Sequence, residues 1–368
     1  MLYDTLKHDD KEVFMQIITN NARIDKYYNL SSYFNPEELL IFDIETTGFA
    51  AEASKLYLIG CCFYNKGNWT ISQWFNDDGN SESDILTLFM EFTKSYKYLL
   101  HYNGDGFDIP YLTKKINEFN LDYSFSHMKS IDLYKVIKPY KSILHIDNLK
   151  QKSLEKYLGI NRLDKYSGGD LIKVYDDYLK TKKDSNKQLL LQHNFEDLEG
   201  FISCCSFMSL DRLKKGDFIV KKMSVRDSKL VFSIELAYEI PKRISFGHYN
   251  IIITGYKNEV SINVPIIEEE LKFYLDNYKD YYYLPAEDVA VHKSVATYVD
   301  KNYRVQAKKE TCYLKRKGYF ITQINKGILS GYKRNIKDVE SFIELSDSFL
   351  KNMDLINLYA RHIIKMML

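Results

Sequence analysis

The sequence lacks any long hydrophobic run. No segment approaches the roughly 18 consecutive apolar residues that a membrane span requires. The first 14 residues (MLYDTLKHDDKEVF) carry charges where a secretory signal needs an apolar core. These absences favour a protein with no membrane partner, and we expect it to be cytoplasmic.

Cysteine and proline are also scarce. The chain of 368 residues has six prolines and five cysteines, with no C-x-x-C spacing for zinc or redox chemistry. The cysteines lie in apolar segments, which favours buried thiols in a reducing compartment. No repeat, linker or low-complexity stretch is visible. With 45% hydrophobic and 27% charged residues, the composition is that of a folded protein, and the length predicts two domains.

Charge is divided unevenly along the chain. The net charge is +1, but residues 211–368 contain 27 Lys and Arg against 20 Asp and Glu, so the remaining part is net negative. This asymmetry suggests a basic surface for a polyanion beside an acidic part that could hold cations.

The order of predicted elements indicates an α/β domain with a mixed sheet flanked by helices. Apolar, β-branched runs predict strands at 39–45, 56–64, 69–75 and 98–102, and helical periodicity follows between and after them. We expect three regions. These are a leader of short helices (1–38) packed on the next domain, an α/β domain (39–210), and a strand-rich α+β domain (211–368). In the last region we expect helices at 268–276 and 287–299 and a hairpin within 310–324.

Asp43 and Glu45 are separated by one residue at the end of an apolar strand. The two-residue period of a strand places both carboxylates on one face, at the rim of the sheet. Crowded carboxylates call for a cation between them, and oxygen ligands favour Mg²⁺ or Mn²⁺. A D-x-E pair alone is more often a solvated strand end.

A second acidic element, Asn103 to Asp108, follows the fourth predicted strand and opens a helix. Its glycines permit a tight turn, and Asp108 lies near the positive end of the helix dipole. An ordinary N-cap is the alternative interpretation, and Asp105 competes with Asp108 for any role.

His193 and Asp197 form the third element. Residues four apart share one face of a helix, so the imidazole and the carboxylate point into the same space. A neutral imidazole can act as a general base near neutral pH. A surface His–Asp pair is the alternative.

Together, these elements resemble the three motifs of the DEDD superfamily of 3′–5′ exonucleases. DIETTG, N-x-x-x-F-D-x-P-Y-L (103–112) and H-x-x-x-D occur in that order. Between the second and third, SIDLYKVIK, SLEKYLGINR and YSGGDL resemble the YprB-like ribonuclease-H-like family of bacteria. The resemblance covers about 39–210 and implies a ribonuclease-H-like fold.

The resemblance implies a site for two divalent metal ions, Mg²⁺ or Mn²⁺, with His193 orienting and deprotonating the attacking water. The His branch usually has four residues between His and Asp and the Tyr branch three, so His193 stands at the Tyr-type spacing. Asp132 could be a further ligand or an internal acid, and we favour the latter. The implied ligands are Asp43, Glu45, Asp108 and Asp197, and the implied substrate contacts are Thr46, Thr47 and Asn103.

A basic stretch with interleaved aromatics lies in the second region. Between 301 and 337 there are eleven basic residues and one acid before Asp338, with tyrosines at 303, 313, 319 and 332. Lysines neutralise phosphates and aromatics can stack on unpaired bases, so the stretch is a candidate platform for single-stranded nucleic acid. A solvated basic hairpin with core aromatics is the alternative. The predicted contacts are Lys308, Lys309, Lys315, Arg316 and Lys317.

The leading hypothesis is a metal-dependent 3′–5′ exonuclease that acts on single-stranded DNA or RNA, or on a 3′ end. The alternatives are a nucleic-acid-binding or scaffold protein that does not cleave, and a nuclease component, structure-directed or endonucleolytic, that acts with a helicase or polymerase partner. The choice between DNA and RNA depends on how a pocket treats the 2′-hydroxyl, which residue types alone leave open.

Overall fold

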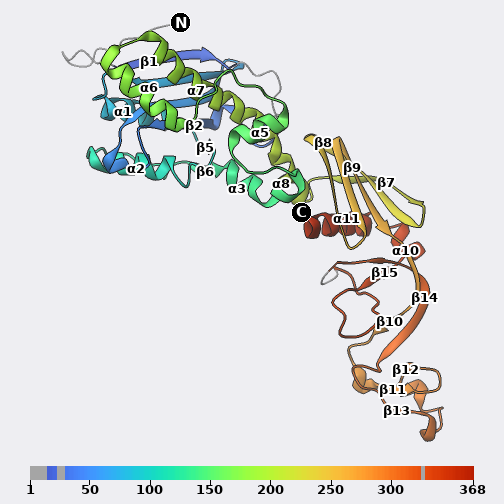
Figure 1. Cartoon of the computed structure of the whole chain (residues 1–368). Helices are drawn as coiled ribbons and strands as arrows, with labels where there is room; N and C mark the ends of the chain where they lie inside the picture. Colours follow the sequence, from blue (N-terminus) through green and yellow to red (C-terminus); the bar gives the residue numbers. More distant parts are fainter. Residues whose placement is uncertain (1–14, 23–29, 325–327) are drawn as a thin grey trace. The chain divides into compact units, whose positions relative to one another are not determined.

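The computed structural model describes residues 15–22, 30–324 and 328–368, and it divides into two compact units, 1–211 and 212–368 (Figure 1). The first unit contains a six-stranded sheet in the order β1-β4-β3-β2-β5-β6. Its strands are β1 (Met15–Asn21), β2 (Leu39–Thr46), β3 (Leu56–Asn65), β4 (Asn68–Asn76), β5 (Tyr98–His101) and β6 (Lys129–Asp132). Its helices are α1 (Glu82–Thr93), α2 (Asp108–Glu118), α3 (Leu133–Ile137), α4 (Lys141–Leu144), α5 (Gln151–Leu158), α6 (Gly168–Thr181) and α7 (Asp184–Cys204), and α8 (Met208–Lys214) spans the boundary between the units.

The sheet is mixed, as the sequence predicts. Strand β1 pairs antiparallel with β4, β4 with β3, and β3 with β2. Strand β5 pairs parallel with both β2 and β6. Helices α1 and α2 pack on one face through a core that includes Phe42 and Trp74. Helices α6 and α7 cover the other face, where Tyr57 stacks on Tyr175 with ring centroids 4.4 Å apart (Figure 1). The predicted helix-flanked α/β architecture is therefore confirmed.

The leader was expected to consist of short helices. Leu30–Ser32 and Pro36–Glu38 are short 3-10 helices, but the expectation is wrong for the segment before them. Met15–Asn21 is an edge strand paired along its whole length with β4, and Thr19 Oγ1 lies 2.9 Å from Ser72 Oγ. Pairing with an existing sheet overrides the weak local pattern of this segment. The remaining expected leader positions 1–14 and 23–29 lie outside the described residues.

Strand β2 alternates between the two faces of the sheet. Leu40, Phe42 and Ile44 belong to the core beneath α1 and α2, so Asp43 and Glu45 point to the opposite face, toward α7. A register shift between Glu45 and Thr46 ends the regular pairing with β3. The strand therefore delivers both carboxylates to one side, at the point where the ladder with β3 becomes irregular.

Helix α7 approaches the sheet most closely over Gly60, which is the partner of Asp43 in the β2–β3 ladder. A Cβ atom at position 60 would lie 1.9 Å from Asn194 Oδ1 and 2.8 Å from Leu198 Cδ1. Asn194 is fully buried and accepts a hydrogen bond of 2.9 Å from Gln73 Nε2. Only glycine leaves room for the helix at this distance from β3.

The second unit consists of three small antiparallel sheets. These are β7 (Ile219–Arg226), β8 (Lys229–His248) and β9 (Ile251–Pro265); β10 (Ile267–Tyr274), β14 (Tyr313–Thr322) and β15 (Phe342–Glu344); and β11 (Tyr281–Leu284), β12 (Val289–His292) and β13 (Val305–Gln306). Its helices are α9 (Lys293–Ala296), α10 (Asp347–Leu350) and α11 (Met353–Met367). Helix α11 buries Tyr359 against Phe232 of β8, with ring centroids 5.5 Å apart. The predicted strand-rich α+β character is confirmed.

Three predicted elements in this unit are wrong. The expected helix at 268–276 is strand β10, and most of the one at 287–299 is turn and strand β12, with only the short α9 helical. The acidic run at 268–270 is typical of a first helical turn, but β14 pairs with this segment in full register. The expected hairpin within 310–324 is the single strand β14, because β10 and β15 pair with it on both sides.

Across the described ranges, no helix is long and apolar enough to cross a membrane.

The close approach at Gly60 yields a stability prediction. Gly60→Ala should lower the free energy of unfolding by about 1–3 kcal/mol, because the new methyl group displaces Asn194 or α7. Urea unfolding of the full chain measures this. Gly168→Ala is the matched control, since a Cβ there meets no atom within 4 Å. Equal stability of the two variants would contradict the steric argument.

Candidate active site

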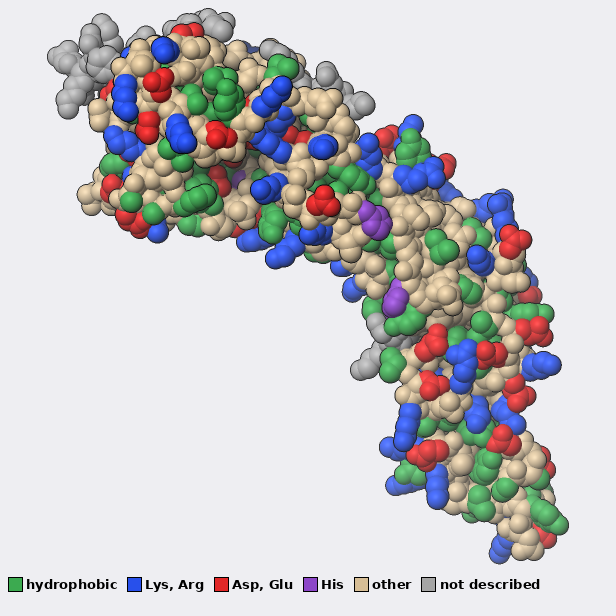
Figure 2. Space-filling view, viewed as in Figure 1, with side chains coloured by type: hydrophobic (Ala, Val, Ile, Leu, Met, Phe, Trp, Pro, Cys, Tyr) green, Lys and Arg blue, Asp and Glu red, His purple; other side chains and the backbone are tan. Residues whose placement is uncertain are grey.

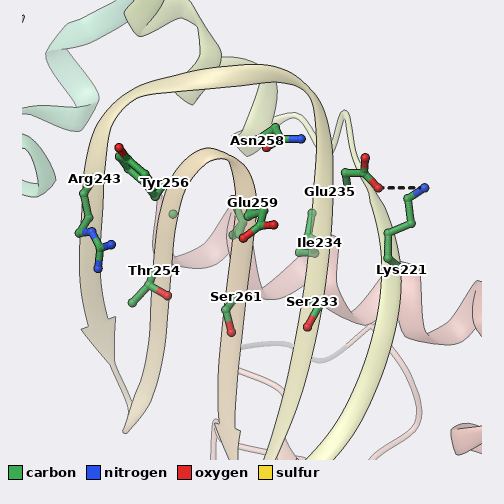
Figure 3. Close-up of a pocket in the computed structure, with 12 residues that line it drawn as sticks. Lys221, Ser233, Ile234, Glu235, Arg243, Thr254, Tyr256, Asn258, Glu259 and Ser261 are labelled. Carbon is green, nitrogen blue, oxygen red and sulfur yellow. Dashed lines mark ion pairs between the residues drawn. The ribbon is translucent and has the colours of Figure 1, made fainter.

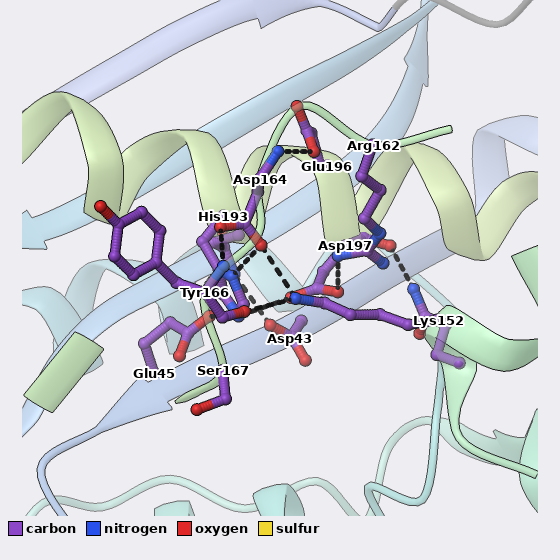
Figure 4. A network of polar contacts seen from close by, with 12 residues as sticks. Asp43, Glu45, Lys152, Arg162, Asp164, Tyr166, Ser167, His193, Glu196 and Asp197 are labelled. Atoms are coloured by element: carbon purple, nitrogen blue, oxygen red, sulfur yellow. Dashed lines mark hydrogen bonds and ion pairs between the residues drawn. The ribbon is translucent and has the colours of Figure 1, made fainter. Parts of the chain in front are cut away.

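Acidic side chains from separate elements converge on the α7 face of the sheet (Figure 4). Glu45 comes from β2 and Asp197 from α7, and together with His193 they offer ligand atoms that all lie within 4.8 Å of one another. Asp43 lies in the same network, where its Oδ2 accepts a hydrogen bond of 2.9 Å from Asn194 Nδ2. We call Asp43, Glu45, Asp108 and Asp197 the carboxylate site.

Asp108 reaches the carboxylate site from the start of α2. Its Oδ1 accepts a hydrogen bond of 3.3 Å from the backbone N–H of Ile44, which lies between Asp43 and Glu45. Asp105, the competing residue, instead bonds Ser130 Oγ at 2.5 Å and Lys135 Nζ at 2.6 Å. The structure therefore places Asp108, and not Asp105, beside the β2 carboxylates.

Burial raises the pKa values of Asp43, Glu45 and Asp108, and neighbouring negative charges add to the effect. Burial is the largest cause for Asp43, followed by the negative charges of Asp197, Glu45 and Asp108. Burial also raises the pKa of Glu45, with Asp197 the next cause. For Asp108, burial raises the pKa to about 7 although backbone N–H groups stabilise the anion. The site thus concentrates negative charge that a cation would relieve.

His193 lies between acidic groups on both sides of its ring. Its Nδ1 donates to Asp164 Oδ2 at 2.6 Å, and its Nε2 is 3.2 Å from Asp197 Oδ2 and 3.6 Å from Glu45 Oε1. Burial raises the pKa of Asp164, but hydrogen bonds from Lys152, Tyr166 and His193 hold it below its usual value. An ionised carboxylate only accepts, so Asp164 fixes the proton on Nδ1 and leaves Nε2 facing the site.

Arg162 and Lys152 bring positive charge to the rim of the site, and the sequence reasoning missed both. Arg162 pairs with Asp197 Oδ1 at 2.5 Å and also with Glu155. Lys152 Nζ lies 2.9 Å from Asp164 Oδ2. Arg162 and Asp164 belong to the loop at 159–167 between α5 and α6, and Glu196 holds this loop by accepting from two of its backbone N–H groups. Figure 4 shows this loop over α7.

Asn194 and Tyr57 were also missed as partners of the carboxylates. Asn194 contacts Asp43, and Tyr57 OH donates to Glu45 Oε2 at 3.4 Å. A signal for Asn194 existed, because it lies three residues before Asp197 on the face of α7 that the His193 spacing predicts. Asp164 lies in a segment noted only for its family resemblance, and no charge pattern marks it as a partner of His193.

The predicted substrate contacts near β2 and β5 have different surroundings. Thr46 Oγ1 donates to the Gly48 carbonyl at 2.8 Å, and Thr47 Oγ1 accepts from the Lys55 N–H at 2.8 Å, so both hydroxyls brace the turn after β2. Asn103 is exposed and adopts a left-handed backbone with φ of 60°. Its backbone N–H donates to Asp132 Oδ1 at 2.9 Å, which gives the buried Asp132 an internal hydrogen-bonding role.

The basic residues proposed as a platform do not share one face. Lys315 and Lys317 lie on one side of β14 and Arg316 on the other, because consecutive strand residues alternate. Lys315 pairs with Asp288 at 2.9 Å and Arg316 with Glu344 at 2.7 Å. Tyr313 and Phe320 are core residues. Figure 2 shows acidic and basic side chains interspersed over this unit. Exposed and without an ion pair to any described residue are Lys308, Lys309 and Lys317.

A second group of potential ligands comprises His101, Asp105 and Asp132. Lys135 already pairs with Asp105 at 2.6 Å. Both ring nitrogens of His101 are engaged, one by the Gly104 N–H at 3.0 Å and one by Ser130 Oγ at 2.7 Å. Lys135 already supplies the positive charge that Asp105 needs. We therefore interpret His101, Asp105 and Asp132 as a structural hydrogen-bond network.

A cavity of about 570 Å³ opens between β7, β8 and β9 of the second unit (Figure 3). Its lining mixes both charges, with Lys221 paired to Glu235 at 3.0 Å and Arg243 held 5.3 Å from the Tyr256 ring. Lys221 and Glu235 neutralise each other, and no group of three potential metal ligands occurs among the described residues that line the cavity.

Comparison with known families agrees with the fold. Residues 40–203 match the family model described as the RNase_H superfamily, and this part of the chain is an RNase H-like domain. The matched range contains the whole carboxylate site and the loop at 159–167.

Two curated relatives are the DNA polymerases of Autographa californica and Bombyx mori nuclear polyhedrosis viruses. Each is 23% identical over 167 residues, which cover 36% of this chain and 17% of the polymerase. The chain thus spans under a fifth of these relatives.

Among solved structures, the family B DNA polymerase of Pyrobaculum calidifontis is similar with a TM-score of 0.40 and 15% identity, covering 49% of this chain and 25% of the polymerase. Exonuclease I of E. coli, in complex with a dT13 oligonucleotide, has a TM-score of 0.28 and 15% identity, covering 59% and 54% of the two chains.

The raised pKa of Asp108 predicts a specific pH dependence in the absence of divalent metal. The folded chain keeps this proton up to about pH 7, whereas the unfolded chain loses it near pH 3.9. Between these values the folded state binds more protons, so stability falls as pH rises. Asp108→Asn should remove this loss, and its stability relative to wild type should rise by at most about 1.4 kcal/mol per pH unit.

Urea unfolding in EDTA from pH 4.5 to 7.5 measures the difference. Asp105→Asn is the matched control: burial raises the pKa of Asp105, but Lys135 and Ser130 hold it below its usual value. Its stabilisation is lost only as pH falls below about 4, so its difference from wild type should stay flat across this range. Identical pH profiles for both variants would contradict the raised pKa of Asp108 in the folded chain.

Proposed function

We propose that this chain is a metal-dependent nuclease that hydrolyses phosphodiester bonds at the carboxylate site. The observation that supports it best is the convergence of Asp43, Glu45 and Asp197 with His193 on one face of an RNase H-like sheet. Asp108 approaches the same strand from α2. As a finer proposal, the motif order supports a 3′–5′ exonuclease of the YprB-like DEDD type acting on a single-stranded end.

The donor set fits two divalent cations. All four acids offer oxygen, the ligand type that Mg²⁺ and Mn²⁺ prefer. Burial, with repulsion from nearby acids, raises the pKa values of Asp43, Glu45 and Asp108. Asp43, Glu45, Asp108 and Asp197 would hold the ions. Divalent cations at such a site supply positive charge to the scissile phosphate and to the attacking water.

The protein contributes the handling of the proton. Because Asp164 holds the proton of His193 on Nδ1, the free Nε2 can accept a proton from a water placed over Asp197 and Glu45. Asn194 and Tyr57 fix the orientations of the β2 carboxylates. Arg162 and Lys152 offset negative charge at the rim, where the substrate adds more.

The proposed activity also defines the substrate and the charge that would bind it. The substrate is nucleic acid with a single-stranded 3′ end, and exposed lysines of the second unit, including Lys308, Lys309 and Lys317, offer additional charge for it. We further propose that the protein is cytoplasmic and that it acts with a helicase or polymerase partner. The similarity to the DNA polymerases of the two nuclear polyhedrosis viruses is consistent with nucleic acid as the substrate class.

Loss of one carboxylate should abolish cleavage. We expect Asp43→Asn to lower the rate by about 10²-fold or more, because it removes a charged ligand while keeping the acceptor for Asn194. The measurement is degradation of 5′-labelled single-stranded DNA and RNA with Mg²⁺, Mn²⁺ or EDTA. A shortening ladder that requires metal and Asp43 supports an exonuclease.

The matched pair Asp108→Asn and Asp105→Asn tests the assignment within one motif. Only the first should lose activity. A circular single strand, which has no end, separates an endonuclease from an exonuclease. Wild-type protein that binds these strands but never shortens them would refute the nuclease and favour a scaffold.

The role of His193 generates a separate prediction. His193→Gln should lower kcat by about 10²–10⁴-fold, the usual contribution of a general base. Asp164→Asn should lower kcat by a smaller factor and leave KM unchanged, because it acts through the orientation of His193. Asp176→Asn, an exposed acid on α6, serves as control. Wild-type kcat in both site variants would rule out this base.

A further inference from the structure

A cleft of about 760 Å³ opens in the first unit beside the carboxylate site. It lies where β5, α3 and the start of α5 meet, elements labelled in Figure 1. We call it the lysine cleft. It is lined by Tyr102, Asn103, Tyr134, Lys138, Lys141 and the segment 148–151.

The walls of the lysine cleft are held by hydrogen bonds from buried groups. Asp132 is 4% exposed, and its Oδ1 accepts from the backbone N–H groups of Asn103 at 2.9 Å and Tyr134 at 3.0 Å. One carboxylate oxygen therefore joins the turn after β5 to the first turn of α3. Tyr102 OH donates to the carbonyl of Leu149, which joins that turn to the third wall. The cleft is preorganised by these bonds.

The charge of the cleft contrasts with that of the site next to it. Lys138, Lys141 and Lys150 are exposed, and within the described residues they form no ion pair. The described lining contains no acid. Three uncompensated lysines in one concave surface attract a polyanion.

The aromatic side chains in the cleft add a second chemical feature. The rings of Tyr102 and Tyr134 lie 6.0 Å apart at an angle of 75°, and Lys138 Nζ lies 5.9 Å from the Tyr134 ring. An aromatic ring flanked by lysines is suited to stacking on an unpaired base while the lysines neutralise its phosphates. Paired bases of a duplex offer no such face.

The cleft is connected to the carboxylate site through Gln151. This residue lines the cleft, and its Nε2 donates to the backbone carbonyl of Asp197 at 2.7 Å. Asn103, an exposed residue of the second motif, also lines the cleft. A strand held in the cleft would have a short path to the acids.

We infer that the lysine cleft binds the phosphodiester backbone of a single-stranded nucleic acid whose end lies in the carboxylate site, with Tyr134 stacking on a base. The inference rests on the proposed nuclease function and deepens it by placing the strand. It assigns the main electrostatic contact to the first unit, and not to the basic stretch of the second.

The test is equilibrium binding of fluorescent oligonucleotides of about 12 nucleotides, dT and rU, measured by anisotropy in EDTA and in the Asp43→Asn background. The triple variant Lys138→Gln, Lys141→Gln, Lys150→Gln should bind more weakly. The slope of log affinity against log salt should fall by about 2, since each phosphate contact on a single strand contributes about 0.7. Tyr134→Leu should weaken binding by about fivefold or more.

The matched control removes the same charge elsewhere in the first unit. It combines Lys66→Gln in the β3–β4 turn with Lys173→Gln and Lys180→Gln on α6, all exposed lysines. An equal loss of affinity in this control, or no loss in the cleft triple, would overturn the assignment. Unchanged binding by Tyr134→Leu would make the cleft a general polyanion site and would also overturn it.

Turnover separates this inference from the proposed function. If wild type cleaves in Mn²⁺ and the cleft triple keeps wild-type KM, the cleft assignment fails while the nuclease stands. If wild type never cleaves but the cleft triple loses binding and the control does not, the cleft assignment stands without the nuclease. The expected result is a raised KM with kcat retained.

Discussion

The packing of α7 against the β2–β3 ladder is the constraint on which the carboxylate site depends. Gly60 admits the helix close enough for Asn194 to reach Asp43, and the same approach brings His193 and Asp197 over Glu45. Gln73 on β4 fixes the amide of Asn194 from the other side. Two elements that are far apart in the chain therefore share one polar layer inside an otherwise apolar interface. The site can form only when that interface is complete.

Burial of like charges in this layer has a cost that the surroundings only partly offset. The pKa values of Asp43, Glu45 and Asp108 are raised, which means that these carboxyl groups ionise less readily in the folded chain than in water. Arg162 pairs with Asp197, and Lys152 pairs with Asp164, but neither cation is paired with an acid of β2. The compensation is thus concentrated on the α7 side, and the β2 side is left to attract a cation.

The sequence predicted the parts of the fold that local pattern determines. The period of two in β2 and the spacing of four in α7 were enough to place Asp43, Glu45, His193 and Asp197 on facing surfaces. Spacing alone left Asp105 as a competitor of Asp108, and only the family motif favoured Asp108. The packing of α2 against β2 separates the two acids in the structure. Asp164 and Arg162 were missed because their positions depend on a loop that is held by Glu196 of another helix.

The errors in the second unit have a related cause. The segment 267–274 carries a helical charge pattern, and its strand conformation arises from pairing with residues of β14 that are 39 to 53 positions away. Contacts between residues distant in sequence also explain why counting lysines overestimated a basic platform. The acids that neutralise Lys315 and Arg316 lie 27 and 28 residues away in sequence but adjacent in space. Counting residues along the chain gives only the number of charged side chains. The fold determines which of those charges remain unpaired.

That distinction explains why the lysine cleft stands out although its unit is net negative. Its three lysines form no ion pair with a described residue, and two acids of the adjoining elements are engaged elsewhere: Asp132 accepts backbone N–H groups, and Asp105 is paired with Lys135. A strand of phosphates approaching the buried acids needs positive charge along its path, since the acids alone would repel it. The fold supplies that charge in a cleft whose lining residue Gln151 donates to the backbone carbonyl of Asp197. A local cation cluster of this kind can guide a polyanion into an anionic site even where the net charge of the unit opposes it.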